Sequence, residues 1–243
     1  MRKAILMGMA VVATAIAGCA RDRAEASAGP ATTRDFQVAG FERLEVGGPY
    51  EVTVTTGSAP SVRASGGEQA IERMVVEVVN GTLRIHPKKR SGMNVGWSGS
   101  IHPVKLAITV PRMTAAQIAG SGSIAVDKIA GDSFDAGIAG SGALRLGQVD
   151  VKRLKAEIAG SGEIKAGQGR ASVVDYGIAG SGGIDAGAIV AEVASVSIAG
   201  SGEVAANATG SASVDIAGSG DVRMTGGAKC TVSKAGSGNV HCS

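Results

Sequence analysis

Ile118-Ala119-Gly120-Ser121-Gly122 is the stretch of sequence that decides the fold, because the chain repeats it at a fixed interval. The seven copies begin at Ile118, Ile138, Ile158, Ile178, Ile198, Ile216 and Lys234. The first five are 20 residues apart, and each of the last two follows 18 residues after the copy before it. A period of this length is typical of a solenoid, in which each unit is too small to bury its own apolar face and must stack on its neighbours.

Apolar residues recur at every second position around each copy of the phrase. Residues that take the same place in successive copies form a column, and the column six residues after the phrase begins contains Ile124, Leu144, Ile164, Ile184, Val204, Val222 and Val240. Intervening positions carry charges such as Arg145 and Glu163. A period of two predicts strands with one buried face, and the glycines predict a sharp corner between them. The sequence therefore predicts an all-β parallel β-helix with coils of about 20 residues.

The last coil carries two cysteines in columns that face inward. Cys230 and Cys242 stand where earlier coils have Val, Leu, Ala and Met. Two thiols that share one interior in an exported chain are expected to form a disulfide, which contributes about 3 kcal/mol for so short a loop. Lys234 also replaces isoleucine here, so we interpret this coil as a staple that closes and blunts the end of the stack. A metal or redox role is disfavoured because no further ligands accompany the pair.

The N-terminus has the features of an export signal. Arg2 and Lys3 precede an apolar stretch over residues 4–17, which is too short to span a bilayer and is followed by Gly18 and Cys19. The Ala-Gly-Cys sequence resembles a bacterial lipobox, which implies a signal peptide over residues 1–18 and lipidation of Cys19. Ala20 in place of Asp implies sorting to the outer membrane, and residues 19–35 are interpreted as the lipidated cysteine and a flexible tether. The alternative is ordinary cleavage to a soluble periplasmic protein.

Residues 36–110 carry strand signals without the repeated phrase. The clearest is a hairpin over residues 74–86, because Asn80-Gly81 favours a type I′ turn. Residues 66–73 are expected to form one short helical turn, and residues 91–100, which contain Trp97, are expected to form a loop. From the residues alone the chain could hold one or two domains.

Composition narrows the classes of function. Aromatic residues make up 2% of the chain, which disfavours a stacking platform for sugars or bases. The net charge of +3 falls to +1 without Arg2 and Lys3, and the only basic run is Lys88-Lys89-Arg90, so nucleic acid is not an expected partner. Gly-Ser-Gly lies between strands and lacks the Asp of calcium-binding repeats, so neither a phosphate loop nor a calcium site is expected. We expect the corner serines to bond to neighbouring backbone.

The best candidate for catalysis is a small charged cluster on the outer face. Glu203 and Asp221 fall in the same outward column on adjacent coils, with Arg223 nearby. Such carboxylates could serve a polysaccharide lyase or hydrolase, but charges that keep the wall soluble are the favoured interpretation. His86, His102 and His241 lie in unrelated settings with no consistent spacing.

Five segments together resemble the head GIN domain family, a domain of unknown function described as a putative autotransporter adhesin. They are Phe41-Glu-Arg-Leu-Glu-Val, Gly48-Pro-Tyr-Glu-Val-Thr-Val, Gly81-Thr-Leu-Arg-Ile, Leu106-Ala-Ile-Thr-Val-Pro and the Gly-Ser-Gly repeats. The resemblance covers about residues 36–243. It implies a right-handed parallel β-helix in which residues 36–110 and the repeats of 111–243 form one domain, and it supplies no catalytic residues to transfer.

Taken together, these features predict a non-catalytic lipoprotein of the cell envelope. It is expected to be held to the outer membrane by its N-terminal lipid and to contact an envelope protein or a surface glycan, without a cofactor or a metal. The alternative is a carbohydrate-active β-helix enzyme.

Overall fold

The computed structural model describes residues 29–38, 40–57, 59–88 and 104–243. In these residues the chain forms a β-solenoid of about six turns with coils of about 20 residues, which confirms the predicted fold class. The predicted signal peptide, Cys19, the loop around Trp97, and His102 lie outside the described residues.

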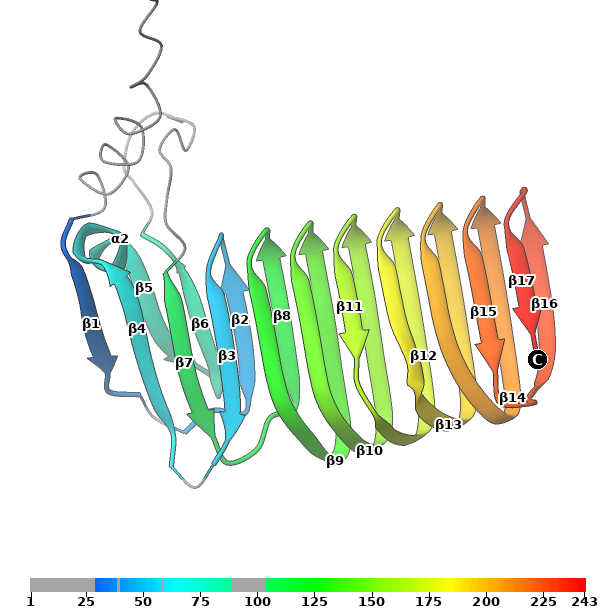
Figure 1. The fold of residues 1–243 in the computed structure, drawn as a ribbon, viewed down its shortest axis with the longest axis horizontal. Helices are drawn as coiled ribbons and strands as arrows, with labels where there is room; N and C mark the ends of the chain where they lie inside the picture. Colours follow the sequence, from blue (N-terminus) through cyan, green and yellow to red (C-terminus); the bar gives the residue numbers. More distant parts are fainter. Residues whose placement is uncertain (1–28, 39, 58, 89–103) are drawn as a thin grey trace, which may run out of the picture.

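The repeats stack as parallel strands that wind around two opposite faces (Figure 1). Three strands of 18 residues each begin just after one corner and continue around a lower bend to the next corner. The strands of the repeats are β8 (Ala115–Gly120), β9 (Ser123–Gly140), β10 (Ala143–Gly160), β11 (Glu163–Ala166), β12 (Gly169–Gly180), β13 (Gly183–Gly200), β14 (Glu203–Gly218), β15 (Asp221–Thr225), β16 (Lys229–Ala235) and β17 (Asn239–Cys242).

The isoleucine column lies inside the solenoid, as the alternation predicts. Each isoleucine pairs in register with the next one along the stack, from Ile118 with Ile138 to Ile198 with Ile216. Their exposed fractions are between 1% and 3%. Stacking therefore removes the same apolar side chain from water in every coil, and this burial is the main force that holds the repeats together.

The Gly-Ser-Gly corners require glycine for two physical reasons. Gly140 has a φ of 128°, a conformation that L side chains rarely adopt, and a Cβ there would lie 2.5 Å from the carbonyl oxygen of Gly120. The Ser141 amide donates to that same oxygen at 2.9 Å. The corner serines bond to neighbouring backbone, as expected, and in the described coils their amides make these bonds while the Ser141 side chain is exposed.

The lower bend is less uniform than the corner. Between β13 and β14 the pairing changes from Asp185 with Ala205 to Val190 with Asn207, and then from Ala191 with Ala208 to Val193 with Ser211. The shortening from 20 to 18 residues therefore takes place at the lower bend, because Ile198 still pairs with Ile216 and the corner glycines remain in register.

The N-terminal strands form a cap on the stack. The N-terminal cap comprises β1 (Ala31–Phe36), β2 (Arg43–Gly47), β3 (Glu51–Thr56), β4 (Ser61–Gly67), α2 (Glu68–Glu72), β5 (Met74–Val79), β6 (Thr82–Pro87) and β7 (Lys105–Val110). Strand β2 pairs with both β6 and β8, and β3 pairs with both β7 and β9. Strands β2 and β3 thus form one coil. Strands β4 to β7 lie on the outer side of this coil, and the repeats stack on its inner side.

Antiparallel pairs close the outer end of the cap. The hairpin of β5 and β6 confirms the prediction from Asn80-Gly81, whose φ values are 51° and 71°, and α2 confirms the expected helical turn. The tether prediction was wrong at its C-terminal end, because residues 31–36 form β1 and pair with β4. Arg63 on β4 donates to the Asp35 carboxylate at 2.6 Å, which adds a side-chain contact to that pairing.

One carboxylate connects the cap to the first repeat. Asp127 accepts hydrogen bonds from the Thr56 amide at 2.9 Å and hydroxyl at 3.0 Å, and from the Lys128 amide at 2.6 Å. The next coils have Gly147 and Gly167 at the corresponding position. Asp127 therefore holds the end of β3 against β9, where their strand pairing has stopped at Val54 and Val126.

The C-terminal coil ends the stack with a covalent link. The structure joins Cys230 to Cys242 through a disulfide, with their Cα atoms 6.6 Å apart, which is the pairing that the columns predict. The Lys234 ammonium donates to the Gly238 carbonyl at 2.7 Å. Val232, which continues a buried column, is 46% exposed because no coil covers it in the described chain.

Candidate functional site

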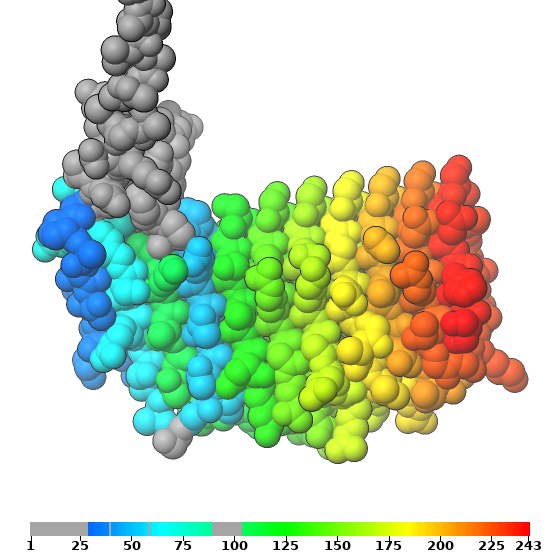
Figure 2. Space-filling model, in the orientation of Figure 1, coloured from blue at the N-terminus to red at the C-terminus, as the bar shows by residue number. Residues whose placement is uncertain are grey.

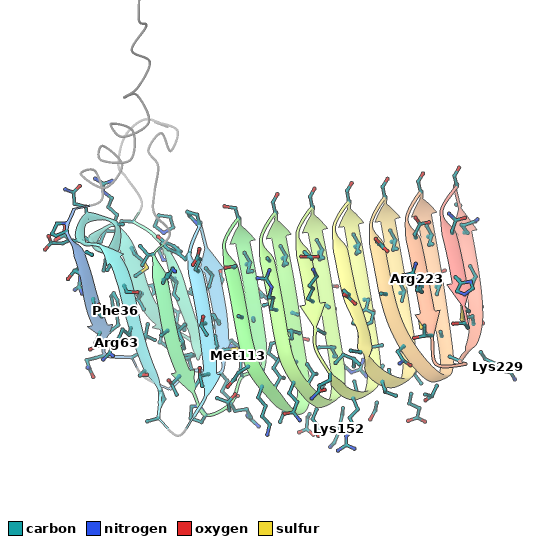
Figure 3. The ribbon with its side chains drawn as sticks, in the orientation of Figure 1. Phe36, Arg63, Met113, Lys152, Arg223 and Lys229 are labelled. Atoms are coloured by element: carbon teal, nitrogen blue, oxygen red, sulfur yellow. A yellow bond between two sulfur atoms is a disulfide. The ribbon has the colours of Figure 1, made fainter. Side chains whose placement is uncertain are left out.

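The sequence pointed to a charged cluster near the C-terminal coils, and strand register does bring its members together. Glu203 pairs with Asp221 on the next coil, and Arg223 lies in an adjacent outward column, where Figure 3 labels it. The Asp221 carboxylate accepts from the Asn239 amide at 2.9 Å and from its side-chain nitrogen at 3.0 Å. Asp221 therefore connects β15 to β17 next to their strand pairing, which is a structural role.

The two histidines that the structure describes, His86 and His241, do not share a site. His86 lies on β6, where its ring nitrogens contact the Pro87 carbonyl at 2.9 Å and the Glu77 carboxylate at 3.4 Å. His241 is exposed on β17 at the far end of the solenoid. The described residues also contain no group of three or more His, Cys, Asp or Glu side chains placed to hold a metal ion.

A hollow at the lower edge of the N-terminal cap is a stronger candidate. Its volume is about 530 Å³, within the range of about 300–1,000 Å³ that is typical of small-molecule sites. Four connections meet there, and the lining residues are Gly40, Phe41, Glu42, Arg43, Pro60, Gly81, Pro111, Arg112 and Thr114. Met113, which Figure 3 labels, lies between Arg112 and Thr114 in the chain and is buried in the core.

Backbone hydrogen bonds fix the walls of the hollow. The Asn80-Gly81 turn presents the Gly81 carbonyl, which accepts from the amides of Glu42 at 3.1 Å and Arg43 at 3.3 Å. The Thr114 amide donates to the Glu42 carbonyl at 2.7 Å, so the entry to β8 is tied to the entry to β2. Three of the four connections are thus tied to one another by backbone hydrogen bonds that need no ligand.

Charged side chains at the hollow come from segments far apart in the sequence. One nitrogen of the Arg112 guanidinium donates to both oxygens of Glu42, at 2.9 and 3.0 Å. One nitrogen of Arg43 donates to the Asn80 carbonyl at 2.7 Å, and within the described residues Arg43 forms no ion pair. Two guanidiniums and one carboxylate give the lining a net positive charge, which favours an anionic group.

The sequence did not reveal this hollow. Glu42 and Arg112 are 70 residues apart, in or next to two segments that carry the family resemblance but supply no site residues, so only the stacking of β2 beside β8 brings them together. The sequence signals nearby were the Asn80-Gly81 turn and Pro111 after β7, and both indicate local chain reversals. Neither signal identifies which loops meet.

On the face that Figure 2 shows, the coils follow one another as bands from the N-terminus to the C-terminus. Many of its charges are paired across or along strands, as with Lys152 and Asp132 at 2.7 Å and Lys165 and Glu163 at 2.9 Å. These pairs are exposed and dispersed. No helix in the described part of the chain has the length and apolarity to cross a membrane.

Comparison with known proteins gives a family and a set of similar folds. The family model described as "Putative auto-transporter adhesin, head GIN domain" matches residues 40–228. No curated protein matches the chain.

Three solved structures illustrate the related folds. The crystal structure of a "putative adhesin" from Bacteroides fragilis is 23% identical, with a TM-score of 0.80 over 88% of this chain and 97% of that one. A "putative lipid binding protein" from Parabacteroides distasonis is 26% identical, with a TM-score of 0.71 over the same shares. A "putative adhesin" from Parabacteroides merdae is 16% identical, with a TM-score of 0.70, and covers the same shares of the two chains.

Proposed function

The chain belongs to the head GIN domain family, and from this membership we propose that it is a non-catalytic, adhesin-like interaction module of the bacterial cell envelope. The observation that supports the proposal most directly is the hollow in the N-terminal cap, a preformed site with cationic side chains on a rigid solenoid. A body with one continuous apolar interior holds such a site in a constant shape, which suits binding. The solved structures named as adhesins agree with this role.

The proposed anchor is a lipid on Cys19. The charged N-terminus, the apolar stretch of residues 4–17 and the small residues before Cys19 support export and lipidation, and Ala20 supports sorting to the outer membrane. We expect Cys19→Ser to release the protein from the membrane fraction into the soluble fraction. A Cys230→Ser variant is the matched control because it removes a cysteine but leaves the signal unchanged. Retention of Cys19→Ser in washed outer membranes would contradict the lipid anchor.

Binding and catalysis are separated by one experiment on the purified full-length protein in mild detergent. Intact cells and isolated envelope polysaccharides are incubated with the protein, and bound protein is measured together with newly formed reducing ends and unsaturated sugars. We expect saturable binding without product. Turnover that disappears in Glu203→Ala would instead support the polysaccharide lyase or hydrolase, whose best candidate residues are Glu203 and Asp221.

A further inference from the structure

We propose that the hollow of the N-terminal cap binds the carboxylate of an acidic sugar, a uronic acid unit of a surface glycan, between the guanidiniums of Arg43 and Arg112. This inference rests on the proposed function, since it names the ligand class for the same site. It follows from how the two arginines are held, from the charge of the lining, and from the space between the walls.

Each arginine is held by one nitrogen and keeps its other donors. Arg43 uses Nη2 on the Asn80 carbonyl at 2.7 Å, and Arg112 uses Nη2 on the Glu42 carboxylate. A guanidinium has five N–H donors and two edges that can hold a carboxylate, one formed by Nε with Nη2 and one by Nη1 with Nη2. The single contact of Arg43 uses one Nη2 hydrogen, so its other Nη2 hydrogen and the neighbouring nitrogen remain as one complete edge for a ligand. Arg112, whose Nη2 contacts both oxygens of Glu42, keeps Nε and Nη1 as single donors. The protein contacts orient the forks in advance, and this reduces the entropy that a ligand would otherwise lose in ordering them.

A carboxylate is the partner that this arrangement fits best. Planar carboxylates accept two parallel hydrogen bonds from an arginine fork, and these charge-assisted bonds are about twice as strong as neutral ones. Glu42 already neutralises Arg112, which leaves the charge of Arg43 without a carboxylate among the described residues. A ligand that brings one negative charge therefore completes the electrostatics of the site.

The shape of the hollow favours a sugar ring over a lone acidic side chain. A volume of about 530 Å³ exceeds what one carboxylate needs, and it leaves room for a ring beside the fork. The ring cannot stack on an aromatic face here, because Phe41 is only 4% exposed. Recognition must then come from charge and hydrogen bonds, so a neutral sugar is expected to bind poorly and a charged one well.

The test compares two forms of one ligand and three variants of the full-length protein in mild detergent. Oligogalacturonate and its methyl ester have the same backbone, but the ester lacks the charge. We expect saturable binding of oligogalacturonate by titration calorimetry, and dissociation constants for the ester that are higher by roughly tenfold or more. Arg43→Ala should weaken binding of oligogalacturonate by roughly tenfold to a hundredfold, and Arg43→Lys, which keeps the charge without the fork, should weaken it nearly as much.

Arg153→Ala is the matched control, because Arg153 is an exposed arginine on β10 that forms no ion pair in the described residues. It should leave the affinity unchanged, and circular dichroism should show that all variants are folded. Equal losses in Arg43→Ala and Arg153→Ala, or equal binding of the methyl ester, would overturn the proposal. The ester comparison decides the matter even where a variant fails to fold, since it needs no substitution.

A third ligand separates sugar from polypeptide. If a glutamate oligomer of equal charge binds as tightly as oligogalacturonate, the site recognises acidic peptides and the assignment to a uronic acid is wrong. Absence of saturable uronate binding would also refute the inference. The proposed function would survive that result if the protein still bound intact cells saturably, and it would fail only if that binding were absent too.

Discussion

The repeats and the N-terminal cap enclose one interior, but different interactions hold them together. In the repeats the same residue returns to the same place, so each coil is held by columns such as that of Ile118 and by glycine corners. In the cap no place repeats, and individual side chains such as Asp127, Arg112 and Arg63 connect particular strands. The repeats therefore depend on glycine at every corner. The N-terminal cap depends on a few side-chain contacts, and its unlike connections can form a binding site.

The largest expected effect is at a corner of the repeats. Gly140→Ala would place a side chain at a φ of 128° and 2.5 Å from the Gly120 oxygen. Because both strain and a backbone clash result, we expect a loss of more than about 3 kcal/mol in the free energy of unfolding, measured by denaturant titration. Gly81→Ala is the control from the cap, since a Cβ there meets nothing within 4 Å, and it should cost only about 1 kcal/mol. Equal losses would show that the corners are no tighter than an ordinary turn.

The next effect concerns the junction between the two regions. Asp127→Ala removes the acceptor for both Thr56 groups, so we expect a loss of about 1–3 kcal/mol. Hydrogen exchange should show faster exchange at the Thr56 amide, while amides of β12 and β13 stay protected. Asp127→Asn keeps one oxygen acceptor and should lose less. Uniform loss of protection along the whole chain would contradict a local role for this carboxylate.

A smaller effect should appear at alkaline pH. Burial raises the pKa of the Tyr50 hydroxyl to about 12, and it also raises the pKa of Tyr176 above its ordinary value. The folded chain therefore binds more protons than the unfolded chain between about pH 10 and 12, and the free energy of unfolding falls as the pH rises through this window. Tyr50→Phe has no such proton to lose, so its Tm should fall less than that of the parent between about pH 9 and 11. Identical decreases would show that Tyr50 does not contribute.

The smallest effect is expected from an exposed ion pair of the repeats. Lys152, which Figure 3 labels at the lower edge, lies 2.7 Å from Asp132, and the two side chains are 78% and 81% exposed. Solvent screens such a pair, so Lys152→Ala should change the Tm by no more than about 1 °C. Arg63→Ala in the cap, which removes the exposed pair with Asp35, is the counterpart. A clear loss in Lys152→Ala would show that cross-coil charges stabilise the repeats.

The sequence predicted the repeats well because residues at equivalent positions of successive coils are of the same type and have the same environment. Ile158 is buried for the reason that Ile138 is buried, and the disulfide of Cys230 and Cys242 follows from their columns. The order of strands in the cap could not be predicted in this way. Whether β2 lies beside β6, β8 or both depends on packing between segments whose sequences differ, and β1 was taken for part of a tether because it pairs only with the distant β4.

The candidate site was missed for a related reason. Arg43 and Arg112 are each ordinary surface residues in the sequence, and their importance arises only where four connections meet. Glu203 and Asp221 were easier to find because register places them on neighbouring coils, yet Asp221 bonds to Asn239 within the ladder. Aligning the repeats into columns therefore predicts which residues are neighbours on the outer surface of the repeats. It does not predict a hollow that forms where segments of different sequence meet.

The two-residue shortening at the lower bend has a consequence for how such a molecule can vary. A coil that gives up residues there keeps its neighbours, since the Ile198 and Ile216 pairing is unaffected. Loops could lengthen or contract along that edge, one coil at a time, while the glycine corners on the opposite edge keep the strands in register. The connections that line the hollow of the cap lie on the same edge (Figure 1), so the edge at which loops can change length is also the edge that carries the candidate binding surface.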